Sequence, residues 1–179
     1  MELPTVLGRG WALLVLVAYP FAVLAMRQRN RCRVALSGLL FLYATAVVAV
    51  TIFPISVVPS SWRVAERWWD VLRPIPFMVP PVGFALNIVM FMPFGVLVPL
   101  LWPRAATIRR VLGWSLASSA LIEFTQLAMW VGLGNRRYFD VNDLFSNTVG
   151  AVFGFVLFRT LRPAAAAERA AVSAGSPDA

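Results

Sequence analysis

Long hydrophobic stretches recur along the chain at lengths that match the width of a bilayer. Five of them qualify or nearly qualify as membrane spans: Gly10–Met26, Val34–Phe53, Phe84–Trp102, Val111–Gly132 and Leu144–Leu161. A transmembrane helix needs roughly 20 mostly apolar residues to cross a hydrocarbon core of about 30 Å. The stretches are continuous and do not alternate between apolar and polar residues, which disfavours a β-barrel. The pattern predicts an all-α, polytopic helical membrane protein with about five transmembrane helices.

Composition supports this class and removes several kinds of chemistry. Hydrophobic residues make up 60% of the 179 positions and charged residues 13%, whereas soluble domains carry about 25% charged residues. Histidine is absent, which excludes Ser-His-Asp triads and His-metal sites, and the single Cys32 excludes clusters of cysteine ligands. All sixteen basic residues are arginines beside hydrophobic stretches, where membrane topology requires them. We therefore expect no nucleic-acid partner, no metal and no cofactor.

The positions of the arginines predict the orientation of the chain. Four arginines follow the first hydrophobic stretch, at Arg27, Arg29, Arg31 and Arg33, whereas the residues before it carry only Glu2 and Arg9. A secretory signal peptide has its positive charge before the apolar region, so cleavage is not expected. Since cytoplasmic loops are enriched in arginine, the cluster should be cytoplasmic. We expect the N-terminus outside and the C-terminus inside.

Two segments lie outside the predicted spans. The long connection Pro54–Gly83 contains Ser61–Arg73, in which tryptophans and arginines recur at helical spacing. This stretch is either a helix in the headgroup layer or a loop folded onto the mouth of the bundle. The tail from Pro163 to Ala179 is rich in alanine, serine and glycine, which is typical of disorder. We expect one transmembrane domain over residues 1–162 and a disordered cytoplasmic tail over 163–179.

Polar side chains interrupt the last three spans, where they are costly and therefore point to function. The fourth span carries one stripe at helical spacing, formed by Ser115, Ser119, Glu123 and Gln126. A second stripe leads into and follows the fifth span, formed by Asp140, Asp143, Asn147, Gly150 and Gly154. The third span carries one polar side chain, Asn87, near its start. In the predicted orientation these groups lie in the outer half of the membrane, beneath Arg136 and Arg137. A shared polar pocket that opens to the outside explains this common depth.

Structural roles compete with this interpretation. One of Asp140 and Asp143 is expected to cap the fifth helix, and Gly150 with Gly154 is expected to allow close helix packing. Glu123 either pairs with Arg136 or Arg137 as a structural ion pair or, if it is unpaired, is a candidate for proton transfer.

The polar positions also carry a family resemblance. The stretch from about 84 to 161 resembles the VanZ-like family of bacterial membrane proteins at these residues: Asn87, Phe91, Pro93, Gly95, Glu123, Gln126, Arg137, Asp140, Asp143, Asn147 and Gly150. Where the family has one arginine before the first aspartate, this chain offers both Arg136 and Arg137. The resemblance implies a multi-pass protein of the bacterial plasma membrane with a role in the cell envelope. The founding member is associated with resistance to the glycopeptide teicoplanin, and no reaction is implied.

Two functions remain open from the sequence. The first is an envelope protein whose pocket binds a lipid, a lipid-linked cell-wall intermediate or a glycopeptide, with these candidate ligand-binding residues: Asn87, Glu123, Gln126, Arg136, Arg137, Asp140, Asp143 and Asn147. The second is an intramembrane enzyme acting on a lipid-linked substrate, with Glu123 as general base and Asp140 or Asp143 as acid or cation ligand. A channel is disfavoured because the inner halves of the spans are almost uniformly apolar. The oligomeric state is left open.

Overall fold

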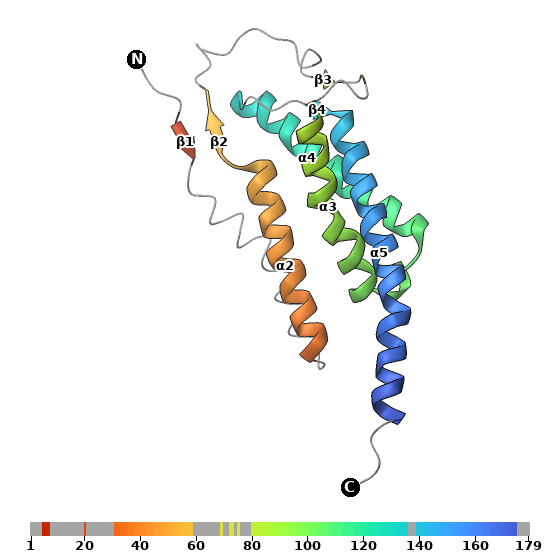
Figure 1. Cartoon of the computed structure of the whole chain (residues 1–179). Helices are drawn as coiled ribbons and strands as arrows, with labels where there is room; N and C mark the ends of the chain where they lie inside the picture. Colours follow the sequence, from red (N-terminus) through yellow and green to blue (C-terminus); the bar gives the residue numbers. More distant parts are fainter. Residues whose placement is uncertain are drawn as a thin grey trace.

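The fold is a bundle of long helices, shown in a computed structural model of the 179-residue chain (Figure 1). The structure describes residues 5–7, 20, 31–58, 69, 72–73, 75, 80–135 and 139–174. The long helices are α2 (Arg31–Ile52), α3 (Pro81–Leu101), α4 (Ile108–Leu133) and α5 (Val141–Ala174). A short 3₁₀ helix, η3 (Pro103–Ala105), joins α3 to α4. The all-α architecture agrees with the class that the hydrophobic pattern predicts.

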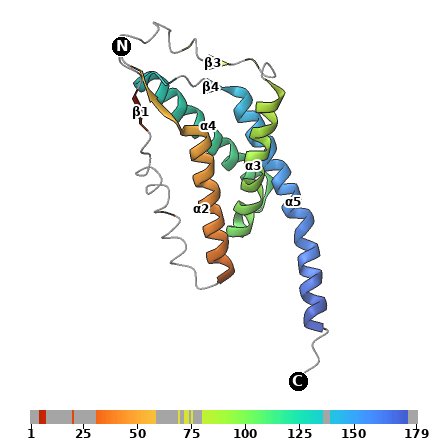
Figure 2. The ribbon, with the colours of Figure 1, turned by 60° about the vertical axis from the view of Figure 1, so that its left-hand side comes forward.

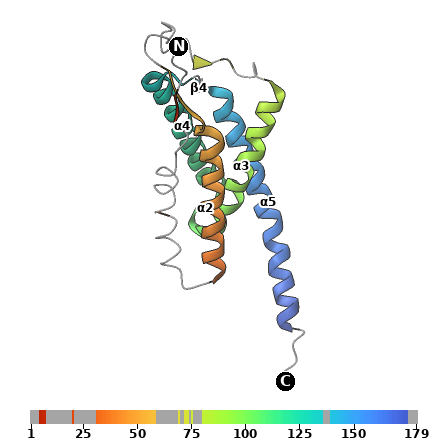
Figure 3. The ribbon, with the colours of Figure 1, turned by 90° about the vertical axis from the view of Figure 1, so that its left-hand side faces the viewer.

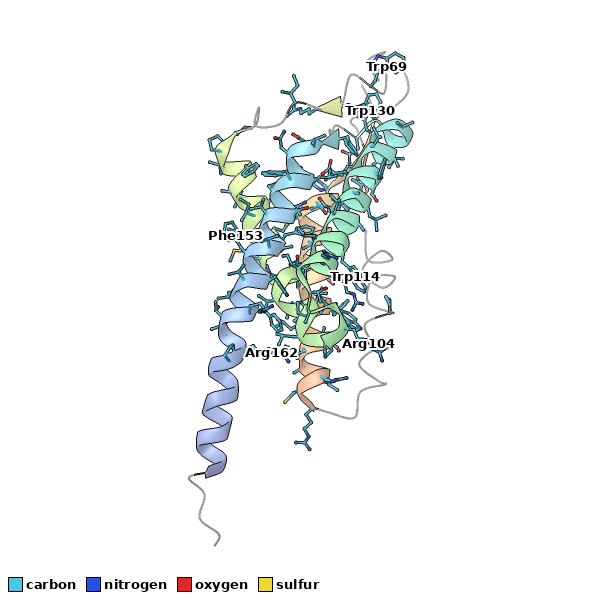
Figure 4. The ribbon with its side chains drawn as sticks, turned by 90° about the vertical axis from the view of Figure 1, so that its right-hand side faces the viewer. Trp69, Arg104, Trp114, Trp130, Phe153 and Arg162 are labelled. Atoms are coloured by element: carbon cyan, nitrogen blue, oxygen red, sulfur yellow. The ribbon has the colours of Figure 1, made fainter. Side chains whose placement is uncertain are left out.

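Four of the described helices are long and apolar enough to cross a membrane: α2, α3, α4 and the part of α5 from Val141 to Pro163. Large hydrophobic side chains point outward along these helices, including Leu121 at 69% exposure and Phe153 at 54% (Figure 4). Exposed apolar surface on this scale suits lipid and not water. The first predicted span, Gly10–Met26, lies outside the described residues. The elements that flank it in the sequence, Thr5–Leu7 and the beginning of α2, lie at opposite ends of the bundle (Figure 1).

Short strands gather at one end of the bundle, which we call the polar end. Strand β1 (Thr5–Leu7) pairs antiparallel with β2 (Ile55–Val57), and β3 (Leu72–Arg73) pairs in parallel with β4 (Phe139–Asp140). The amphipathic helix predicted over Ser61–Arg73 lies mostly outside the described residues. At its last two residues the backbone is extended and pairs with the segment that leads into α5, which there favours the second open interpretation, a loop folded onto the mouth of the bundle.

Helices α3 and α5 make the closest contact in the bundle, although α4 lies between them in the sequence (Figure 2). A Cβ atom on Gly95 would collide with the carbonyl oxygen of Ala151. On α5, a Cβ on Gly150 would collide with the carbonyl of Ile88, and one on Gly154 with that of Met92. Since only glycine leaves room for this approach, the predicted close packing at Gly150 and Gly154 agrees with the structure.

The remaining helix contacts are made by two clusters of apolar side chains. In the first, Leu40 of α2 packs against Leu97 and Leu101 of α3 (Figure 3). In the second, the first turn of α4 packs against α5 through Val111, Ala151, Phe155 and Phe158. Together with the glycine contacts, these clusters hold α2 on one side of α3 and α5 on the other.

The two ends of α5 differ from the sequence prediction. The helix begins at Val141 and not at Leu144, because Asp140 caps it and Asp143 occupies its first turn. Its backbone stays helical through 164–174, where we expected a disordered tail, since runs of alanine have the highest helix propensity. Residues 175–179 lie outside the described part of the chain, so the expectation of disorder there stays a prediction.

Candidate functional site

Polar side chains from α3, α4 and α5 meet at the polar end, inside the bundle. Glu123 of α4 is 1% exposed, so it faces protein and not lipid. Its Oε2 accepts a hydrogen bond from the backbone N–H of Asp140 at 2.9 Å. This bond joins α4 to the start of α5.

Asp143 connects all three helices. Its Oδ1 accepts a hydrogen bond from Nδ2 of Asn87 on α3 at 2.6 Å, and its carboxyl group lies within hydrogen-bonding reach of the Glu123 carboxyl. Asn87, Glu123 and Asp143 therefore form one contiguous polar set, which we call the carboxyl network.

Asp140 has the capping role that the sequence assigns to one of the two aspartates. It precedes α5, and its Oδ1 accepts hydrogen bonds from the backbone N–H of Asn142 at 2.8 Å and from the Asn142 side chain at 2.7 Å. Nδ2 of Asn142 also donates to the carbonyl oxygen of Ile75 at 3.2 Å. Asn142 thus fastens the long connection to the beginning of α5.

Below the carboxyl network, Asn147 joins α5 to α4. The side chain is 2% exposed, and its Nδ2 donates to Oγ of Ser119 at 2.9 Å. Ser119 donates in turn to the backbone carbonyl of Asp143 at 3.4 Å, whereas Ser115 bonds to Leu112 within its own helix at 3.1 Å. These bonds give the two serines and Asn147 structural roles within and between the helices.

Gln126 points away from the carboxyl network. The side chain is 6% exposed, and its Nε2 donates to the carbonyl oxygen of Thr51 at 2.8 Å. Since Thr51 is on α2, Gln126 joins α4 to α2. The structure therefore separates Gln126 from the other predicted site residues of the last three helices.

A cavity of about 530 Å³ adjoins the carboxyl network, and we call it the polar-end cavity. Among the described residues, four polar and seven apolar ones line it. The polar ones are Arg73, Asn87, Asp140 and Asp143, and the apolar ones are Val50, Pro80, Gly83, Phe84, Leu86, Val89 and Met90. Glu123 and Asn147 are absent from its lining. The cavity thus has a charged wall made by β3 and the start of α5, and an apolar wall made by α2 and α3.

The sequence interpretation missed two residues here. Arg73 was assigned to the amphipathic stretch, yet it lines the cavity with Asp140 and Asp143. Asn142 was missed because it does not belong to the expected stripe of Asp140, Asp143 and Asn147. Its spacing of four residues from the buried Ser146 was the available signal, because this spacing marks a second polar face of α5. Arg136 and Arg137 lie outside the described residues, so their pairing with Glu123 stays a prediction. Within the described part of the chain, no group of three carboxylate or cysteine side chains is arranged to hold a metal ion.

Together, these observations define a polytopic α-helical membrane protein with a buried polar network at one end. The family model VanZ/LLP1 matches residues 13–162, so the chain belongs to the VanZ/LLP1 family. This match confirms the resemblance to VanZ-like proteins that the polar positions indicated. No curated protein and no solved structure matches the chain.

Proposed function

We propose that this protein binds an amphiphilic lipid of the cell envelope in the polar-end cavity. The ligand class is a membrane lipid or a lipid-linked cell-wall intermediate, with its polar head against Arg73, Asn87 and Asp143 and its chain along α2 and α3. The observation that carries the proposal is the composition of the cavity, in which one wall is charged and the other is apolar. Ligand sites of this size are mostly apolar, with a few polar groups that orient the ligand.

The apolar wall favours a ligand that enters from the bilayer. Val50 is 68% exposed, and Leu86 and Val89 are each 62% exposed, so this wall continues onto the outer surface of the helices. A lipid can move sideways from the bilayer onto such a surface without passing through water. A small water-soluble solute gains no binding free energy from contact with this apolar surface, which favours an amphiphilic ligand.

The arginines support an orientation in which the polar end faces outward. The arginines with described side chains at the opposite end, which we call the arginine end, are these: Arg31, Arg33, Arg104, Arg109, Arg110, Arg159 and Arg162. Cytoplasmic segments are enriched in arginine, so the arginine end is assigned to the cytoplasm. The polar-end cavity then opens to the outer leaflet of the bacterial plasma membrane, with the N-terminus outside and the C-terminus inside.

Family membership adds a physiological part to the proposal. The founding VanZ-like protein is associated with teicoplanin resistance. A protein that binds a lipid-linked cell-wall intermediate in the outer leaflet would change the accessibility of that intermediate there. We therefore include a contribution to glycopeptide tolerance in the proposed function.

An intramembrane enzyme is the alternative, and one observation bears on it. Asp143 lines the cavity and lies within hydrogen-bonding reach of the buried Glu123, so a substrate in the cavity would meet the Asp143 carboxyl first. In this alternative Glu123 acts through Asp143 as a proton donor or acceptor. Turnover of a lipid-linked substrate that is lost in Glu123→Gln would favour the enzyme over the binding protein.

The binding proposal is tested by filling the cavity. Leu86→Trp places a large side chain in the apolar wall, and Leu121→Trp adds the same side chain to the outer face of α4, away from the cavity. The probe is a photoactivatable polyprenyl-phosphate-linked sugar added to the purified protein in lipid nanodiscs. We expect crosslinking to be lost in Leu86→Trp and kept in Leu121→Trp. Equal crosslinking in both variants would contradict the proposal.

A further inference from the structure

Five arginines from three elements gather where α4 begins. They are Arg104 in η3, Arg109 and Arg110 in the first turn of α4, and Arg159 and Arg162 on α5. We call this group the arginine cluster. All five side chains are exposed, and Figure 4 shows Arg104 and Arg162 at the same end of the bundle. The packing of Val111 against Phe158 brings the two helices together at this height.

Among the residues whose side chains the structure describes, the cluster has no acidic counterpart. Those acidic side chains are Glu123, Asp140 and Asp143, all toward the polar end, whereas Glu168 lies further along α5, beyond Arg162. Two of the arginines are also held in place by neighbours. Arg110 donates a hydrogen bond to the carbonyl oxygen of Arg104, and the Arg162 guanidinium lies 6.0 Å from the centre of the Phe158 ring. Positive groups held together in this way repel each other unless an anion lies among them.

Apolar side chains continue from the cluster toward the middle of the membrane. On α4, Leu112 and Trp114 are 37% and 50% exposed, and on α5, Leu157 is 42% exposed. The ring centroids of Trp114 and Trp102 are 6.1 Å apart, and paired tryptophans of this kind are typical of the membrane interface. The surface therefore joins a group of cations to a lipid-facing apolar strip.

We propose that the arginine cluster is a binding site for an anionic phospholipid of the leaflet at the arginine end. Guanidinium groups grip phosphate oxygens with paired hydrogen bonds, and the lipid's chains lie along the exposed face of α4 and α5. A soluble phosphate would use the arginines and leave the apolar strip uncovered. This site is separate from the polar-end cavity and does not depend on its proposed function.

The experiment measures lipid binding to the purified full-length protein by native mass spectrometry. The probes are phosphatidylglycerol, phosphatidylcholine with the same chains, and glycerol phosphate. The test variant is Arg109→Gln/Arg110→Gln, and the matched control is Arg31→Gln/Arg33→Gln, which removes the same charge from the first turn of α2. We expect phosphatidylglycerol to bind about 30-fold more weakly to the test variant, from roughly fivefold per arginine. The control should change by less than about threefold.

Three results would overturn the proposal. An equal loss in both double variants would show a diffuse surface charge and no site. Equal binding of phosphatidylcholine and phosphatidylglycerol to the wild type would remove the role of the anion. Binding of glycerol phosphate as tight as that of phosphatidylglycerol would make the ligand a soluble anion. A thermal unfolding midpoint measured for each variant distinguishes lost binding from lost folding.

Discussion

Asn87 of α3 donates a hydrogen bond to Asp143 of α5 over 2.6 Å, although 56 residues separate the two in the chain. The same aspartate lies within hydrogen-bonding reach of Glu123 on α4 and lines the polar-end cavity. One carboxyl group thus fixes the relative positions of three helices and faces the space where we propose that the ligand binds. Stability and binding are therefore linked at Asp143.

Removing the Asn87 donor should loosen the bundle. In Asn87→Ala, the half-buried Asp143 loses a hydrogen bond to its charged group, and we expect a loss of about 1–3 kcal/mol in unfolding free energy. The measurement is SDS-induced unfolding of the purified protein. Val89→Ala, which truncates an exposed side chain on the same helix, is the control. If the two variants are equally stable, the bond contributes nothing to the fold.

Substitutions of Glu123 should separate the contribution of its hydrogen bonds to the stability of the fold from the contribution of its charge. In Glu123→Gln, the side-chain oxygen still accepts from the Asp140 N–H and the new NH₂ group donates to Asp143, so we expect a change of less than about 1 kcal/mol. In Glu123→Leu both partners are left unsatisfied, and we expect a loss of about 3 kcal/mol. Unfolding of the two proteins in the same detergent provides the comparison. A glutamine variant as unstable as the leucine variant would show that the fold needs the ionisable group itself.

The contact between α3 and α5 should tolerate no side chain at its glycines. Gly154→Ala would drive a methyl group into the backbone carbonyl of Met92, and we expect a loss of about 1–3 kcal/mol. Gly113→Ala on α4 is the matched control, because a Cβ there has no heavy atom within 4 Å. Helix propensity makes this second substitution neutral or stabilising by up to about 1 kcal/mol. The opposite order of stabilities would contradict the close packing.

The proposed orientation can be read from single cysteines. Cys32 is exposed at the arginine end, and Ile75 is 59% exposed at the polar end. A membrane-impermeant thiol reagent added to intact cells should therefore leave wild-type protein unlabelled and should label the double variant Cys32→Ser/Ile75→Cys. Permeabilised cells, in which Cys32 becomes accessible, give the control. Labelling of Cys32 in intact cells would reverse the orientation.

Hydropathy predicts the extent of the described long helices to within a few residues, except at the C-terminal end of α5. The second, third and fourth predicted stretches agree within a few residues with α2, α3 and α4. The start of α5 was placed three residues late, as were the starts of the other three helices; at α5, Asp143 lowers the local hydropathy, although the Asp140 cap makes this turn helical. The end of α4 lies close to its prediction, since Gly134, with φ 71°, adopts the left-handed conformation that ends a helix.

The buried polar set was accessible from helical spacing and depth, because a polar side chain inside a membrane must find a partner on a neighbouring helix. This reasoning places Asn87, Glu123 and Asp143 together. It fails for Gln126, whose partner is a backbone carbonyl of α2 that no pattern of side chains marks. It also fails for Arg73, because the path of the long connection depends on tertiary pairing with β4 and not on hydropathy.

The contact of α3 with α5 has a consequence for biosynthesis. Because α5 is the last of the long helices to leave the ribosome, Asn87 and Glu123 have no aspartate to bond during the synthesis of everything before it. A nascent chain that stops after α4 would present these groups to lipid and would be a natural target for membrane quality control. The polar-end cavity is thus complete only once the start of α5 has been synthesised.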